Sequence, residues 1–429
     1  MAVPDGVSGS RATDISDSIE EAIREGRLPT GAQLPTVRAL ADRLHVSPST
    51  VSAAYRYLRQ RGVISTHGRG GTRVHRRPPV DISGAQPPDA ALRNVSTMPT
   101  EAELVQINRD ALNEIVDRRT LADDGQLEQR LAKHLDADGL DATSVVAMGS
   151  GQEALARILE SHLLPGDRVG IEAPSSSIIT DVLALGSQQA VGLRLDDEGI
   201  VPSALDQALS RLRAIVLSPR AQNPTGTAIS PDRARTLRRL LERRPDLVVI
   251  EWDANGELSG VPYVPVVSSS MQRWAHVRSY ADAFAHQSDL AAVVGDPVTV
   301  SRVRGRQLLS GTQLTPLARQ IAINVLEHPG TPHRTDALTR HVASRRILVM
   351  AALRHRGITS MGQSGPFVWI PTTNQELVVG AMADRGWHLV GGEQPDPTTA
   401  QGVRVAVENL DPVLSGRLAD DLLEVLAEI

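Results

Sequence analysis

Few side chains in this sequence could carry covalent chemistry. Lys133 is the one lysine among 429 residues, and a lysine amine is the group that forms a Schiff base with an aldehyde. It stands in the string GQLEQRLAKHL, whose charged neighbours predict a solvated helix surface. Cysteine is absent, which excludes disulfides, thiolate metal sites and cysteine nucleophiles, and we expect no metal site. Amine chemistry is therefore limited to one position.

Positive charge comes almost entirely from arginine and is unevenly distributed. Residues 1–77 hold twelve arginines against seven acids, and residues 50–77 hold seven arginines and no acid. The rest of the chain holds 33 basic and 43 acidic residues, which gives the net charge of −5. A basic end on an acidic body predicts an anionic partner for that end.

Three helices are predicted within the basic end. Apolar residues recur at helical spacing in residues 13–25 and again in residues 36–44. Ser47 and Pro48 are typical of a helix start, because a serine hydroxyl caps a free amide and proline lacks the amide that the first turn leaves unpaired. Gly62 is typical of the end of this third helix.

A hairpin follows the third helix. Residues 63–66 and 72–74 are strand-like and flank a glycine-rich basic tip at residues 67–71. This order of elements predicts a winged helix-turn-helix. The string LPTVRALADRLHVSPSTVSAAYRYLRQRGVISTHGRGGTRV also resembles the DNA-binding domain of GntR-type bacterial repressors, nearly residue by residue.

The resemblance implies a partner, double-stranded operator DNA. The third helix would face the major groove or its backbone, an arginine of the second helix would bind a phosphate, and the wing would enter the minor groove. One module makes few contacts, so we expect a homodimer on a repeated operator. The residues assigned to DNA binding are Arg38, Ser47, Ser49, Thr50, Ser52, Tyr55, Arg56, His67 and Arg69.

The acidic body reads as an α/β domain. After a short linker at residues 78–80, strand-like and helical stretches alternate, which predicts a mostly parallel sheet covered by helices. The helical stretches are residues 101–117, 125–135 and 152–163, and the strand-like runs are residues 168–171, 214–217, 247–251 and 291–294.

Five strings in the body resemble fold-type I aminotransferases and occur in that family's order. They are GSGQEALARIL, LLPGDRVGIEAP, LSPRAQNPTGTAIS, VVIEWDANGELSG and HVRSYADAFAHQSDLAAVVG. A GntR-like head on such a body is the arrangement of MocR-type transcriptional regulators. The resemblance implies a winged helix-turn-helix at residues 10–77 and, at residues 81–429, a large aminotransferase-like domain with a mixed, mostly parallel sheet, for dimerisation and possible effector binding.

Part of the family's cofactor site survives. In the family, amides around the turn at Ser150, Gly151 and Gln152 bind the phosphate of pyridoxal phosphate. Asn223 would hydrogen-bond the ring oxygen, and Arg404 would hold a substrate carboxylate by two parallel hydrogen bonds. An ordinary strand-to-helix turn and a structural ion pair are the alternatives for these features.

Other positions of that site have changed. Ser176 stands where an aromatic ring stacks on the cofactor. Trp252 stands where an acid charges the ring nitrogen, with Asp253 as the alternative if the alignment slips by one residue. Asp282 takes the place of the Schiff-base lysine, and Asp289 that of the phosphate-binding arginine.

These changes reverse the charge of the site. Two cations become two anions, and each like-charge contact at ~4 Å and an effective dielectric near ~20 costs a few kcal/mol. The covalent bond is lost as well. We therefore expect no pyridoxal phosphate cofactor and no enzyme activity.

The sequence predicts a DNA-binding regulator whose body is a dimer scaffold with a possible effector pocket at the former cofactor site. Asp282 and Asp289 opposite Arg404 favour a cationic or zwitterionic small molecule. Two alternatives stay open. One is a MocR-type regulator that binds pyridoxal phosphate non-covalently through Ser150, Gly151 and Asn223, and the other is a working aminotransferase.

The N-terminus is polar, and no run approaches the ~20 apolar residues of a membrane span. We expect a cytoplasmic protein with no membrane partner.

Overall fold

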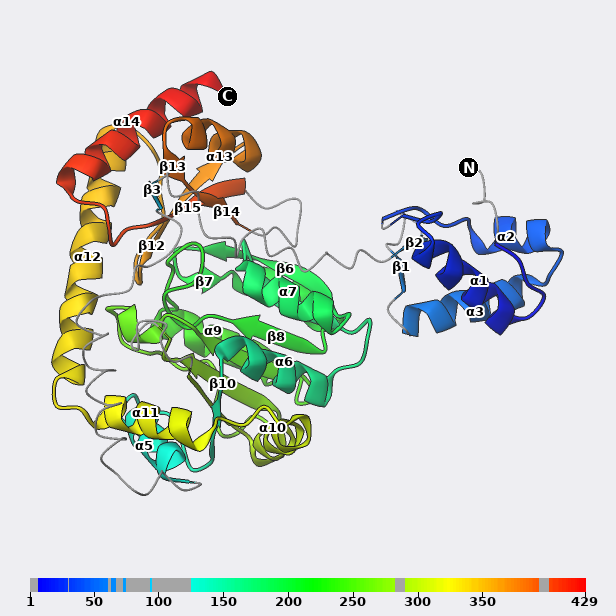
Figure 1. The fold of residues 1–429 in the computed structure, drawn as a ribbon, viewed down its shortest axis with the longest axis horizontal. Coiled ribbons are helices and arrows are strands. Elements are labelled where there is room, and N and C mark those ends of the chain that lie inside the picture. Colours follow the sequence, from blue (N-terminus) through cyan, green and yellow to red (C-terminus); the bar gives the residue numbers. More distant parts are fainter. Residues whose placement is uncertain are drawn as a thin grey trace. The chain divides into compact units, whose positions relative to one another are not determined.

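The computed structural model describes residues 7–29, 31–60, 63–66, 72–74, 93–94, 125–281, 290–392 and 401–429 (Figure 1). The chain divides into two compact units, the first made of residues 1–82 with the short segments 163–167 and 183–189, and the second of the rest of residues 83–429. The predicted linker at residues 78–80 and the helix predicted at residues 101–117 lie outside the described residues.

The first unit contains the predicted helices and hairpin. Strands β1 and β2 pair antiparallel, with Ile64 opposite Val74. One face of each helix is apolar, and these faces meet in a core that includes Ile15, Leu40 and Leu58. The elements are α1 (Ala12–Arg24), α2 (Val37–Leu44), α3 (Pro48–Gln60), β1 (Ile64–Thr66) and β2 (Thr72–Val74).

Local capping defines the turn between α2 and α3. The Thr36 hydroxyl accepts a hydrogen bond from the amide of Ala39 at the start of α2. At its end, His45 takes a left-handed conformation, with φ 53°. The Ser47 hydroxyl then accepts a hydrogen bond from the Thr50 amide at 3.1 Å, so Ser47 caps α3 as predicted.

Tyr55 is a core residue, and its assignment to the DNA surface was wrong. Its side chain is 1% exposed, and its hydroxyl donates a hydrogen bond of 2.9 Å to the carbonyl oxygen of Pro35. Burial raises the pKa of the phenol. The position lies on the same helix stripe as Val51 and Leu58, which turns it towards α1 and α2.

The second unit is built on an eight-stranded mixed sheet, which confirms the predicted α/β class (Figure 1). Its strand order is β4-β11-β10-β9-β8-β5-β6-β7, and β11 runs antiparallel to both of its neighbours. Helices cover the sheet, and an apolar core lies beneath them. The strands are β4 (Val145–Met148), β5 (Arg168–Ala173), β6 (Gln189–Asp196), β7 (Gly199–Ile200), β8 (Ala214–Leu217), β9 (Val248–Asp253), β10 (Trp274–Ser279) and β11 (Ala291–Gly295).

The helices of this sheet follow its strands along the chain. They are α5 (Gln126–Asp136), α6 (Gly151–His162), α7 (Ser177–Leu185), α8 (Pro202–Leu209), α9 (Pro231–Leu241), η3 (Gly256–Leu258), α10 (Pro297–Ser310) and α11 (Pro316–Glu327). The helices predicted at residues 125–135 and 152–163 and all four predicted strands are confirmed within a few residues.

A smaller layer with its own apolar core completes the second unit. The long helix α12 (Thr331–His355) runs from the region of α5 and α11 to this layer (Figure 1). The remaining elements are β3 (Arg93–Asn94), β12 (Phe367–Thr372), α13 (Gln375–Asp384), β13 (Trp387–His388), β14 (Val390–Gly391), β15 (Gln401–Ala406) and α14 (Pro412–Glu428).

A buried ion network crosses the centre of the large sheet. Asp253 on β9 stands opposite Arg278 on β10, and its carboxylate is bound by Nε of Arg278 at 2.9 Å and by Arg220 at 3.0 Å. The exposed fractions are 0% for Asp253, 1% for Arg278 and 6% for Arg220. Burial alone would raise the pKa of the Asp253 carboxyl, but the two guanidinium groups hold that pKa well below its usual range.

We predict that Tyr55→Phe destabilises the first unit without weakening DNA binding. Loss of the buried hydrogen bond costs about 1 kcal/mol, which corresponds to about fivefold faster amide exchange in α3. Hydrogen–deuterium exchange on the full-length chain measures this. The control is Tyr57→Phe, the same change at a side chain that is 50% exposed. Weaker DNA binding with unchanged exchange would contradict the core assignment.

We predict that Asp253→Asn lowers the free energy of unfolding of the second unit by about 3–5 kcal/mol, because two buried arginines lose a charged partner. All four tryptophans lie in this unit, so their fluorescence during urea unfolding reports on it. Asp246→Asn is the control, since its ion pairs are at the surface and its side chain is 55% exposed. That change should cost about 1 kcal/mol or less. Equal effects of the two variants would count against the network.

Candidate functional site

The start of α3 presents a row of short hydroxyls. Ser47, Ser49 and Ser52 are exposed, while Thr50 is half-buried. The Ser47 hydroxyl lies 2.7 Å from that of Ser49 and 2.8 Å from that of Thr50. A helix start with exposed hydroxyls and unpaired amides suits a phosphate oxygen.

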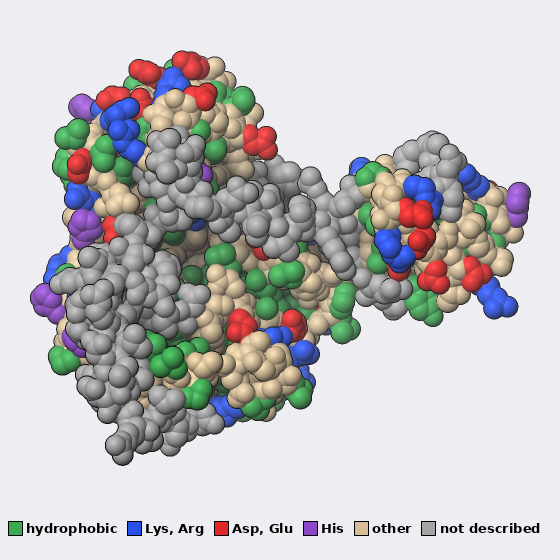
Figure 2. Space-filling view, in the orientation of Figure 1, with side chains coloured by type: hydrophobic (Ala, Val, Ile, Leu, Met, Phe, Trp, Pro, Cys, Tyr) green, Lys and Arg blue, Asp and Glu red, His purple; other side chains and the backbone are tan. Residues whose placement is uncertain are grey.

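Exposed arginines accompany these hydroxyls. Arg56 on α3 and Arg38 on α2 are both exposed, and α3 contains no acid. Most acids of the first unit lie instead on or directly after α1, from Asp14 to Glu25. The face shown in Figure 2 carries acidic and arginine side chains mixed together. The predicted wing residues His67 and Arg69 lie outside the described residues.

In the second unit, the turn before α6 caps the start of that helix. The Ser150 hydroxyl accepts a hydrogen bond of 3.1 Å from the amide of Glu153 and so caps α6. Gln152 is exposed, and Gly151 is buried. This geometry is that of an ordinary capped helix start, the alternative already considered for this turn.

Trp252 lies directly against this turn. A Cβ atom on Gly151 would stand 2.8 Å from Cη2 of the Trp252 indole, so only a glycine fits under the ring. The same position would be 3.7 Å from Cβ of Ser279. Trp252 is 5% exposed. The bulky ring therefore fills the space beside the turn that binds phosphate in the resembling enzymes.

Asp253 does not belong to this site. Successive residues of a strand point to opposite faces, so Trp252 and Asp253 cannot both face α6. The carboxylate of Asp253 is bound to Arg220 and Arg278 on the other face. The alternative that a one-residue slip brings Asp253 to the cofactor position was wrong, because the two buried arginines hold it away.

Two of the surviving family positions contact each other. Nη1 of Arg404 donates a hydrogen bond of 2.8 Å to the side-chain oxygen of Asn223, and its guanidinium lies 4.4 Å from the centre of the Phe367 ring. Burial lowers the pKa of Arg404 to about 10, so the group is charged at neutral pH. Ser176 is 6% exposed and has no ring to stack. Asp282 and Asp289 lie outside the described residues.

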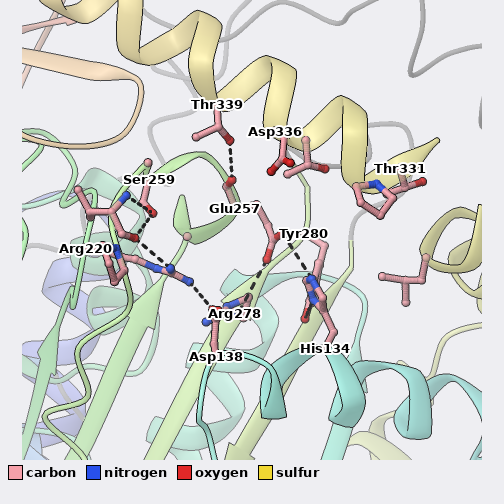
Figure 3. Close-up of a pocket in the computed structure, with 17 residues that line it drawn as sticks. His134, Asp138, Arg220, Glu257, Ser259, Arg278, Tyr280, Thr331, Asp336 and Thr339 are labelled. Atoms are coloured by element: carbon pink, nitrogen blue, oxygen red, sulfur yellow. Dashed lines mark hydrogen bonds and ion pairs between the residues drawn. The ribbon is translucent and has the colours of Figure 1, made fainter. Parts of the chain in front are cut away.

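The structure also contains a cavity that the sequence did not predict (Figure 3). Its volume is about 430 Å³, within the range of small-molecule sites. Charged side chains from η3, β10, α12 and the segments after α5 and β8 line it, and none of them was among the predicted pocket residues. They are Asp138, Arg220, Glu257, Arg278 and Asp336, with His134 beside them. A signal existed, because β9 and β10 are apolar strands in which charged residues recur at every second position.

Glu251 and His276 are the second pair of ionisable residues on these strands. They stand opposite each other on β9 and β10, and Nδ1 of His276 lies 2.9 Å from the Glu251 carboxylate. That carboxylate also accepts hydrogen bonds from the Tyr263 hydroxyl and from the amides of Val266 and Val267. Glu251 is therefore fully engaged as a structural group.

Two further functions have no support within the described part of the chain. None of its helices combines the length and apolarity that crossing a bilayer requires. No group of three or more histidine or acidic side chains there is arranged to hold a metal ion.

Comparison with known proteins divides the chain in the same way. Residues 11–74 match the family described as bacterial regulatory proteins, gntR family, and residues 101–421 match aminotransferase class I and II. The structure is similar to the multiple substrate aminotransferase of Thermococcus profundus, with a TM-score of 0.72, 17% identity and coverage of 80% of this chain and 92% of that one. At this identity the likeness establishes the fold.

Two relatives that span both parts of the chain are regulators. The vitamin B6 salvage pathway transcriptional repressor PtsJ of Salmonella typhimurium is 31% identical over 98% of this chain and 99% of its own. The pyridoxine biosynthesis transcriptional regulator PdxR of Corynebacterium glutamicum is 26% identical over 88% and 87%. The chain therefore belongs to the MocR-type transcriptional regulators of the GntR family, which join a DNA-binding winged helix-turn-helix to an aminotransferase-like domain.

Proposed function

We propose that this regulator works without pyridoxal phosphate and that its aminotransferase-like domain serves as dimer scaffold and effector sensor, not as an enzyme. The observation that carries the proposal is the position of Trp252. Its indole packs on Gly151, at the turn where the resembling enzymes bind the cofactor phosphate. An acid at this position would pair with the ring nitrogen of the cofactor, whereas an indole offers neither that charge nor the space.

The other residues of the former cofactor site do not fit a cofactor held on a lysine. Lys133, the one lysine, is exposed on α5. Ser150 caps its own helix, and Nη1 of Arg404 is engaged by the side-chain oxygen of Asn223. Asp282 supplies an acid where the family has its amine. A Schiff base requires that amine, which favours a non-enzymatic role.

Exposed leucines support the dimer scaffold. Leu308 and Leu309 at the end of α10 are 55% and 91% exposed, and Leu317 at the start of α11 is 44% exposed. Apolar side chains gathered on a surface commonly mark protein interfaces. A dimer would also bring two winged helices to two half-sites of one operator.

The relatives suggest where the operator lies. PtsJ and PdxR are both named for control of vitamin B6 genes. We propose the promoters of B6 vitamer genes in the protein's own genome as the first targets to examine. This second step rests on the full-length similarity to PtsJ and leaves the nature of the effector open.

We predict that pyridoxal phosphate gives no saturable change in absorption with the purified protein. The exposed Lys133 amine could react with the aldehyde, so Lys133→Arg is the matched control that removes this adventitious adduct. A signal lost in Lys133→Arg is surface modification and leaves the proposal intact. Saturable micromolar binding that survives Lys133→Arg and is weakened by Asn223→Ala would instead support non-covalent use of the cofactor.

We predict that Arg38→Ala weakens operator binding equally for all sequences and lowers the slope of log K against log salt by about 1, as expected for one lost phosphate contact. The operator is first selected from randomised duplexes and is expected to contain two half-sites. Arg24→Ala is the control, because Arg24 is exposed on α1 and pairs with Glu21. Equal operator affinities and salt slopes for the two variants would show that Arg38 does not contact the DNA.

A further inference from the structure

The cavity of Figure 3 lies between the large sheet and α12. Arg278 comes from β10, Glu257 from η3 and Asp138 from the turn after α5, while α12 closes the opposite wall. On α12, Thr331, Thr335 and Thr339 follow one another at helical spacing and line the cavity together. The sheet side is thus charged, while α12 offers hydroxyl groups and the carboxylate of Asp336.

The charges of the cavity do not cancel. Arg220 and Arg278 are matched by Asp253 beneath them and by Asp138, which lies 3.0 Å from Arg220 and 2.8 Å from Arg278. Glu257 and Asp336 are left in excess when histidine is counted as neutral. Together with Asp253 beneath them, the groups around the cavity carry two more negative than positive charges, and the lining residues alone carry one more.

Glu257 has no hydrogen-bond donor among the described residues. Its side chain is 12% exposed, and the nearest nitrogen atoms of basic side chains are Nη1 of Arg278 at 3.8 Å and Nε2 of His134 at 3.9 Å, both too far for a hydrogen bond. Asp336 is exposed on α12 and makes no ion pair with a described residue. A largely enclosed carboxylate such as Glu257, without a hydrogen-bond donor, favours a cation beside it.

Arg278 indicates that the ligand also carries a hydrogen-bond acceptor. Its Nη2 atom is buried and makes no hydrogen bond with a described residue, although Nε and Nη1 are both engaged. Buried polar atoms are nearly always satisfied, so a missing partner at a cavity wall points to a ligand or an ordered water. The group that would satisfy a guanidinium nitrogen is an oxygen acceptor.

We propose that this cavity binds a small molecule that carries a cationic nitrogen and an oxygen acceptor. The cation lies between Glu257 and Asp336, and the acceptor lies at the Arg278 end. Among the described residues, none of those assigned to the former cofactor position lines this cavity, so the site is distinct from the turn at Ser150 and from Trp252. The role of the ligand as effector rests on the proposed function.

The position of α12 explains how a ligand would act. Its first turns line the cavity, and the Thr339 hydroxyl donates a hydrogen bond of 3.1 Å to the carbonyl oxygen of Glu257. Further along, Val342 and Val349 belong to the core of the smaller layer. A ligand that contacts both walls holds α12 against the sheet. If the arrangement with α12 held against the sheet binds DNA more or less tightly than the alternative, the ligand raises or lowers operator affinity accordingly.

The test uses three probes with one five-carbon chain and full-length protein without DNA. Isothermal titration calorimetry compares 5-aminopentanoate, pentylamine and pentanoate at equal ionic strength. We expect 5-aminopentanoate to bind more tightly than pentylamine, and pentanoate to show no binding. Equal binding of all three probes, or no binding of either amine, would overturn the proposal.

Variants locate the binding. Glu257→Gln keeps the shape and removes the charge, so 5-aminopentanoate should bind roughly tenfold or more weakly. Asp336→Asn is a second test at an exposed position, where folding is not at risk. Asp384→Asn, an exposed carboxylate on α13, is the control and should bind as the native protein does. Unchanged affinity in both cavity variants would refute this site.

Operator binding is measured separately, so the two proposals can fail independently. If the amine binds in a Glu257-dependent way but the protein binds no operator, the cavity site is supported and the proposed regulatory function is refuted. Amine binding with unchanged operator affinity would sustain the site and refute its role as effector pocket.

Discussion

The pairing of Asp253 with two buried arginines is the constraint on which the large sheet depends. Charges are costly inside a protein unless they are paired and hydrogen-bonded, and this carboxylate is completely enclosed. Because Asp253 and Arg278 stand opposite on β9 and β10, the pair also specifies the register of these strands. Gly256 passes so close to the carboxylate that a Cβ atom there would collide with it. The turn after β9 is thereby held over the network.

The same strand separates two possible sites. Alternation along β9 sends Asp253 to the ion network and Trp252 to the start of α6. On one face an indole packs on Gly151 and contributes apolar contacts without any ligand. On the other face the ion network forms the floor of a charged cavity beneath α12. A scaffold that resembles aminotransferases can therefore keep its fold while the side chains on the two faces of this strand change.

The first unit depends on capping at the start of α3 and on packing along its buried face. Ser47 satisfies the start of α3, while Tyr55 anchors the middle of that helix to the carbonyl of Pro35. The exposed hydroxyls and Arg56 are thus displayed on a helix whose opposite face is fully engaged in the core. Rigid presentation of this kind lowers the ordering cost of binding a phosphate backbone.

The sequence alone determined the helices and hairpin of the first unit, part of the helices and strands of the second, and the family, because capping residues, apolar periodicity and ordered strings are local signals. It also located the changes at Trp252 and Asp282. Tertiary structure decided which side of each element faces a partner. Tyr55 was mistaken for a DNA contact because its place on the helix depends on α1 and α2, and Asp253 was ambiguous until its arginine partners were known. The cavity at Glu257 could not be predicted, since its walls come from residues 134–339 and meet only when α12 closes over the sheet.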